Sequence, residues 1–156
     1  MRKSIYILSL LGAGALYSCS QGTEKRKEAG ATKLDSANMK CYSAVDSVDS
    51  ASLKLITDKE GKITGSLLIN YKEKGDSHGD ITGKFHGDTL FVDYSFQIGT
   101  TNKTFYKNPL AFLKKDDKLF MGVGQIQTFL GKSSFVDNKR INFERGRFNF
   151  SLVDCK

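Results

Sequence analysis

The chain has 156 residues, a formal net charge of +7, three cysteines and no tryptophan. This length is enough for one domain with a real hydrophobic core. The charge is uneven: residues 41–100 carry six Lys against nine Asp and Glu (−3), whereas residues 101–156 carry eleven Lys and Arg against five Asp and Glu (+6). A basic half could meet anionic lipid, acidic glycans or nucleic acid. The secretion signal described next leads us to expect no nucleic-acid partner.

The first eighteen residues have the three parts of a secretory signal. Arg2 and Lys3 are followed by an apolar run over residues 5–16 and then by Tyr17 and the small residue Ser18 before Cys19. A dozen apolar residues are fewer than the ~20 that span a bilayer as a helix. Leu16-Tyr17-Ser18-Cys19 resembles the bacterial lipobox, in which the cysteine carries the lipid. We therefore predict a signal peptide over residues 1–18 and a palmitate-bearing anchor at Cys19, the alternative being an ordinary signal peptide followed by a chance cysteine.

The rest of the chain divides at residue 41. Residues 19–40 are polar, with too few large apolar side chains to order themselves, and predict a flexible tether. Residues 41–156 carry the patterned sequence of one domain. With Cys19 lipidated, Cys41 and Cys155 remain as a pair in a compartment that permits disulfides, so we predict a bond between them. The alternative is two free thiols.

From Cys41 onward, apolar residues alternate with polar ones at the period of a β-strand. Glycine, aspartate and asparagine interrupt this pattern at 58–61, 75–79, 87–88 and 116–117, which predicts short hairpins. About eight antiparallel strands need their edges hidden, so we predict an all-β meander closed as a small lipocalin-like barrel, with a β-sandwich as the alternative.

Residues 126–138 lack clear alternation and are the one weak helical candidate. A parity switch at Gly146 predicts a β-bulge within a last strand over residues 141–152, and Pro109 indicates a strand edge or bulge.

A distinctive set of segments runs through the domain: Cys41-Tyr42, Leu53-Lys54-Leu55, Ile63-Thr64-Gly65-Ser66-Leu67, 70–74, Gly87-Asp88-Thr89-Leu90, Asp93-Tyr94-Ser95-Phe96 and Gly122-Val123-Gly124. In these segments the chain resembles a group of small, mostly uncharacterised Bacteroidota lipoproteins. The similarity extends over most of the mature chain and implies a β-barrel-like lipoprotein without indicating an activity. The chain departs from the pattern of the group where a turn is one residue longer, at 73–76, and where Gln97-Ile98-Gly99 replaces Ser-Glu-Gly.

The candidate metal ligands are dispersed. His78 and His86 fall at opposite ends of one predicted strand, roughly 25 Å apart, and cannot share a metal. The aspartates between them are what hairpin turns require. Neither histidine lies in a recognisable catalytic motif, and no free cysteine remains. We expect no metal, no cofactor, no catalytic residues and no enzymatic activity.

The best candidate for a binding surface is the basic and aromatic segment near the C-terminus. Arg140, Arg145 and Arg147 interleave with phenylalanines there, and arginine pairs well with carboxylates or sulfates. Tyr94 and Phe96 share one strand face and are expected at the same ligand site. We therefore expect a non-enzymatic module that binds a small apolar or anionic ligand, held on the outer membrane through its lipid and facing the periplasm rather than the cell surface. The alternative is a structural or protein-interaction lipoprotein with a filled barrel, which meets an envelope protein or inhibits a hydrolase.

Overall fold

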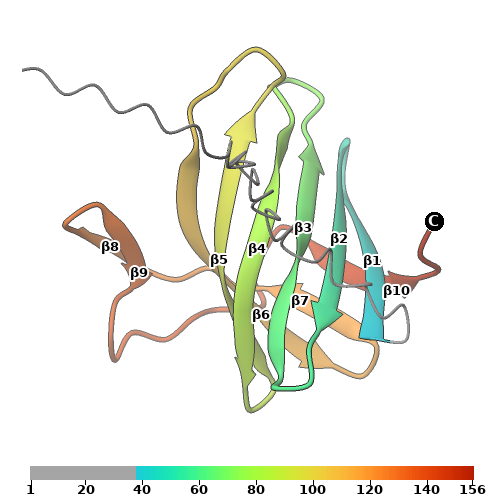
Figure 1. Cartoon of the computed structure of the whole chain (residues 1–156), viewed down its shortest axis with the longest axis vertical. Coiled ribbons are helices and arrows are strands. Elements are labelled where there is room, and N and C mark those ends of the chain that lie inside the picture. Colours follow the sequence, from blue (N-terminus) through green and yellow to red (C-terminus); the bar gives the residue numbers. More distant parts are fainter. Residues whose placement is uncertain (1–37) are drawn as a thin grey trace, which may run out of the picture. The chain divides into compact units, whose positions relative to one another are not determined.

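A computed structural model describes residues 38–156 (Figure 1). The predicted signal peptide, the anchor at Cys19 and all but the end of the tether lie outside this range. The first strand begins at Met39, so Met39 and Lys40, assigned above to the tether, belong to it. The strands are β1 (Met39–Asp46), β2 (Asp49–Thr57), β3 (Lys62–Asn70), β4 (Ser77–His86), β5 (Thr89–Ile98), β6 (Tyr106–Lys115), β7 (Lys118–Met121), β8 (Ile126–Phe129), β9 (Lys132–Phe135) and β10 (Asn149–Val153).

Eight of these strands form a closed antiparallel barrel in the order β1-β10-β7-β6-β5-β4-β3-β2. Each strand pairs with its neighbours in sequence, except that β8 and β9 form a separate hairpin between β7 and β10. This confirms the predicted barrel and excludes the sandwich. Two local predictions are wrong: residues 126–138 contain the β8–β9 hairpin instead of a helix, and residues 141–148 form a loop rather than a bulged strand.

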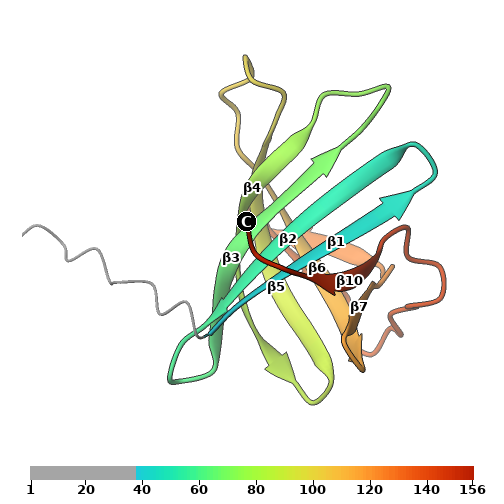
Figure 2. The same ribbon diagram turned by 90° about the vertical axis from the view of Figure 1, so that its right-hand side faces the viewer.

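The two ends of the barrel differ (Figure 2). At one end, called here the disulfide end, β1 begins and β10 ends, next to the turns β2–β3, β4–β5 and β6–β7. At the other end, called the mouth, lie the β1–β2 turn and the longer β3–β4 and β5–β6 connections. The turns carry the predicted residues: Gly87 (φ 59°) and Asp116 (φ 54°) adopt the left-handed backbone that two-residue hairpins require.

The sequence Ile-Thr-Gly occurs twice, at 63–65 in β3 and at 81–83 in β4. The two copies lie directly opposite each other, with Ile63 paired to Gly83 and Gly65 paired to Ile81. Each buried isoleucine therefore lies beside a glycine across the strand pair. A side chain at Gly65 would overlap the Lys54 carbonyl oxygen on β2. The glycine thus permits close approach of the strands in the strongly curved wall of the barrel.

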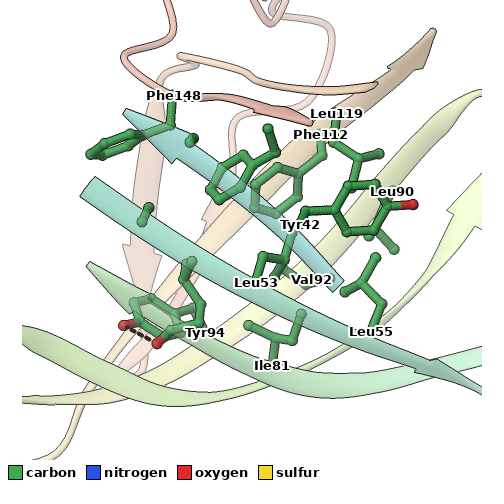
Figure 3. Close-up of a cluster of buried hydrophobic side chains, with 14 of the residues drawn as sticks. Tyr42, Leu53, Leu55, Ile81, Leu90, Val92, Tyr94, Phe112, Leu119 and Phe148 are labelled. Carbon is green, nitrogen blue, oxygen red and sulfur yellow. Dashed lines mark hydrogen bonds between the residues drawn. The ribbon is translucent and has the colours of Figure 1, made fainter. Parts of the chain in front are cut away.

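Large side chains fill the centre of the barrel and its disulfide end. Figure 3 shows a cluster of these buried side chains. Phe112 and Phe150 are fully buried and meet edge to face, with ring centroids 5.8 Å apart. Leucine and isoleucine from β2, β3, β4, β5 and β7 complete this layer at Leu53, Ile63, Leu67, Ile81, Leu90 and Leu119. The packed layer therefore separates the disulfide end from the mouth.

Cys41 in β1 is bonded to Cys155, just beyond β10, with Cα atoms 5.2 Å apart, which confirms the predicted disulfide. It lies beside the seam where the barrel closes, and β1 and β10 pair there through only three residues each. The sequence separation of 114 makes the closed loop almost as long as the domain itself.

Replacing both cysteines (Cys41→Ser with Cys155→Ser) is expected to lower the free energy of unfolding by up to about 4–5 kcal/mol, because so long a loop restricts the unfolded chain strongly. Urea unfolding followed by circular dichroism measures this difference. The disulfide would have no such role if reduction of the wild-type protein left its unfolding midpoint unchanged.

Candidate functional site

A pocket of about 450 Å³ opens at the mouth of the barrel. Its walls come from the mouth-side ends of β3, β4, β5, β6, β7 and the segment entering β10, and they are mainly apolar and aromatic. Its lining residues are Ile69, Tyr71, Lys74, Gly75, Ser77, Tyr94, Phe96, Ile98, Asn108, Leu110, Met121, Val123, Arg147 and Phe148. Ser77 is one reason for the space, because this small residue occupies a buried position at the start of β4.

Tyr94 and Phe96 form one wall of the pocket, in agreement with their predicted position on one strand face. Their rings stack with centroids 4.6 Å apart and planes inclined by 12°, and Tyr106 extends the series at 5.6 Å from Phe96. The Tyr94 hydroxyl donates to the Leu67 carbonyl oxygen (3.0 Å) and lies 2.9 Å from Ser77 Oγ. Burial raises the pKa of Tyr94 to about 12. Tyr94 is therefore a neutral, fixed part of the wall and not a group that exchanges protons near neutral pH.

Arg147 also lines the pocket, but its guanidinium is already paired. Nε donates to Asp46 and Nη2 donates to Asp49, each at 2.7 Å, and these carboxylates flank the β1–β2 turn. The guanidinium carbon lies 5.8 Å from the ring centroid of Tyr71 and 5.3 Å from that of Phe148. Arg147 therefore ties the segment entering β10 to the β1–β2 turn at the mouth, and its charge is balanced without a ligand.

The electrostatics of this contact are those of a stable ion pair. The backbone N–H of Lys72 and then the Arg147 guanidinium hold the pKa of Asp49 below its ordinary value. The same contact raises the pKa of Arg147, chiefly through its hydrogen bonds to Asp49 and Asp46. Both partners stay charged near neutral pH.

Lys74 is the pocket-lining cation that sequence analysis missed. Its Nζ lies 5.9 Å from the Tyr71 ring centroid, and within residues 38–156 no carboxylate lies at ion-pair distance from it. The residue lies in the β3–β4 connection, where no periodicity distinguishes a side chain that faces the pocket from one that faces solvent.

Arg140 and Arg145 do not belong to this pocket. Both are exposed on the segment between β9 and β10, outside its lining. Phe143, on the same segment, lies beside Gly122. The structure therefore does not bring the three predicted arginines together at this pocket, because residues 141–148 do not continue β10 as a strand.

The histidines occupy opposite ends of β4, as the predicted strand requires: His78 pairs with Gln97 and His86 with Thr89. Among the described residues, no group of three or more His, Cys, Asp or Glu side chains gathers as metal ligands would. Within residues 38–156 there is also no helix of the length and hydrophobicity that crossing a membrane requires.

No family model, curated protein or solved structure matches this chain. The resemblance to Bacteroidota lipoproteins thus stays a prediction from the sequence.

Asp49→Asn is expected to lower the melting temperature at neutral pH. In acid, the difference in melting temperature between this variant and the wild type is expected to become smaller. The pKa of Asp49 is depressed in the folded protein, so its stabilisation is complete above the ordinary carboxyl pKa near ~3.9 and is lost as the pH falls through the folded value. Thermal melts between neutral pH and acid test this. Asp80→Asn is the control, because it removes the same charge on the outside of β4. If the melting temperature of that control differed from wild type with the same pH dependence, the pH-dependent stabilisation could not be assigned to Asp49.

Tyr94→Phe is expected to destabilise the barrel by about 1–3 kcal/mol, because it removes the partner of the buried Ser77 hydroxyl. Ser77→Ala combined with Tyr94→Phe should cost less than the sum of the single changes, since no unpaired hydroxyl is left in the double variant. Denaturant unfolding of the wild type, the two single variants and the double variant measures the four free energies of unfolding that this comparison needs. If the losses in unfolding free energy of the two single variants add up to that of the double variant, the contact between the Ser77 and Tyr94 hydroxyls contributes nothing to stability.

Proposed function

We propose that this domain is a non-enzymatic binding module that takes a small, mainly apolar ligand carrying an anionic group into the mouth of the barrel. The observation that carries the proposal is the half-filled interior: a tightly packed layer lies beneath an apolar pocket of about 450 Å³. Ligand pockets fall in the range of roughly 300–1,000 Å³ and combine apolar walls with a few polar groups.

The lining indicates how such a ligand would lie. Ile69, Leu110 and Met121 offer apolar contacts, and the Phe96 ring offers a flat face. Lys74 is the cation available to an anionic group, because the Arg147 charge is balanced by two aspartates. The described lining contains no carboxylate, histidine or cysteine, and its buried tyrosine has a raised pKa. These features favour binding over catalysis.

We further propose that lipid on Cys19 holds the module on the outer membrane, facing the periplasm. The support is the signal sequence and the lipobox-like tetrapeptide at 16–19. In the barrel, β1 begins at the disulfide end, so the chain from Cys19 enters the domain at the end opposite the mouth. Because the chain enters at the opposite end, the tether would not block access of a ligand to the mouth.

A second candidate is a protein-interaction role, favoured by apolar side chains on the rim of the mouth. Phe105 is 66% exposed and lies with Ile98 and Tyr106 at the β5–β6 connection. A protein partner would cover this rim without requiring an occupied pocket. The two candidates are therefore separated by whether a small molecule binds inside the barrel.

Val123→Trp is expected to reduce binding of an anionic naphthalene sulfonate dye at least tenfold, because the larger side chain would occupy the pocket that Val123 lines. Dye fluorescence titration measures the affinity. Val45→Trp is the matched control, since Val45 is 73% exposed, Val123 is 51% exposed, and Val45 does not line the pocket. Equal dye binding by both variants would rule out the mouth as the binding site.

Native mass spectrometry of the protein purified from its host supplies the complementary test. A retained small-molecule mass in wild type that is lost in Val123→Trp supports the binding module. A ligand-free mass together with no dye binding would favour the protein-interaction alternative.

A further inference from the structure

The β8–β9 hairpin projects from the outside of the barrel wall (Figure 1). Large apolar side chains are exposed at the end of this hairpin. Phe129 is 75% exposed and Leu130 is 90% exposed, which is unusual for large apolar residues next to each other. Phe129 ends β8 and pairs with Lys132, and Leu130 is the first residue of the two-residue turn between them. The hairpin thus ends in a convex apolar tip, defined here as Phe129 and Leu130.

The backbone at this tip is costly for the residue found there. Leu130 has φ 47°, in the left-handed region, and is followed by Gly131 at φ 77°. Asparagine or glycine occupies the first of these turn positions at lower cost than leucine does. Within the described residues, the Leu130 side chain gains little burial in return. A leucine that is both strained and exposed is explained by a contact outside the domain.

The base of the hairpin is fixed to the barrel. Phe135 meets Phe91 of β5 with ring centroids 6.3 Å apart, and it also lies beside Gly124. Ile126 and Phe135 are paired across the hairpin at its base. The tip is therefore held out by packing and keeps a defined direction relative to the barrel.

The charge around the tip is positive. Lys132 follows the tip after Gly131, and Lys107 of β6 lines the same surface hollow as Lys132, together with Asp93. Between Gln125 and Val136 the sequence has no carboxylate, and residues 101–156 as a whole carry eleven basic against five acidic side chains. This setting favours an anionic surface as the partner.

We propose that the tip of the β8–β9 hairpin inserts into the interface of an anionic lipid bilayer and orients the barrel on the membrane. Two side chains cover far less than the roughly 1,200 Å² of a stable protein–protein interface. A convex tip would need a matching pocket on a protein, whereas a bilayer yields to any shape and accepts apolar groups beside lysines. The contact is weak by itself and suits a protein held near the membrane by other means.

Because the chain has no tryptophan, Phe129→Trp gives the full chain a single reporter at the tip. With vesicles of phosphatidylcholine and phosphatidylglycerol, we expect its emission to shift to shorter wavelength and to be quenched by brominated lipid chains. High salt should reduce the quenching, because it screens the lysines. Phe105→Trp is the matched control at the rim of the mouth, where Phe105 is also largely exposed.

Adding Leu130→Asn to Phe129→Trp separates insertion from folding. Asparagine suits the left-handed backbone, so this variant should melt at the same or a higher temperature while losing most of the quenching. The proposal is overturned if Phe129→Trp is not quenched, if Phe105→Trp is quenched as strongly, if Leu130→Asn leaves the quenching unchanged, or if pure phosphatidylcholine vesicles give the same result. The dye-binding result at the mouth is independent of all four outcomes.

Discussion

Closure of the barrel depends on β10, a strand of five residues that pairs through three residues with β1 on one side and with β7 on the other. Two contacts outside the ladder reinforce this seam at its opposite ends. The Cys41–Cys155 disulfide holds the disulfide end, and Arg147 holds the mouth by binding Asp46 and Asp49 across the β1–β2 turn. Without this closure β1 would present an open edge to solvent.

The closed wall defines an interior, and side-chain volume decides how much of it is filled. Phe112 and Phe150 fill the middle, while Ser77 at the mouth leaves space next to the stacked Tyr94 and Phe96. An eight-stranded barrel is just wide enough for this balance, so a few residues separate a packed interior from one with a pocket. The proposed ligand site thus follows from where small and large residues alternate along the strands.

The candidate site was predictable in part. Strand periodicity puts Tyr94 and Phe96 on the buried face, and the cysteine count predicts the disulfide. The sequence predicts one late strand that carries Arg140, Arg145 and Arg147. In the structure all three lie in the irregular segment between β9 and β10, and of the three only Arg147 lines the pocket. Lys74 was missed because its position depends on how the β3–β4 connection folds over the mouth. In a strand, the period of two tells which face of the sheet each side chain lies on, whereas irregular segments have no such period.

The sequence by itself determined the strand pattern and the turn chemistry, because these depend on neighbours along the chain. The cysteine count predicted the pairing of Cys41 with Cys155. The sequence also predicts lipid attachment at Cys19. Tertiary structure alone decided that Arg147 is an ion-paired clasp across the seam, that the interior is filled only in part, and that Phe129 and Leu130 stand clear of the wall. Each of these depends on residues far apart in sequence meeting in space, which no local pattern records.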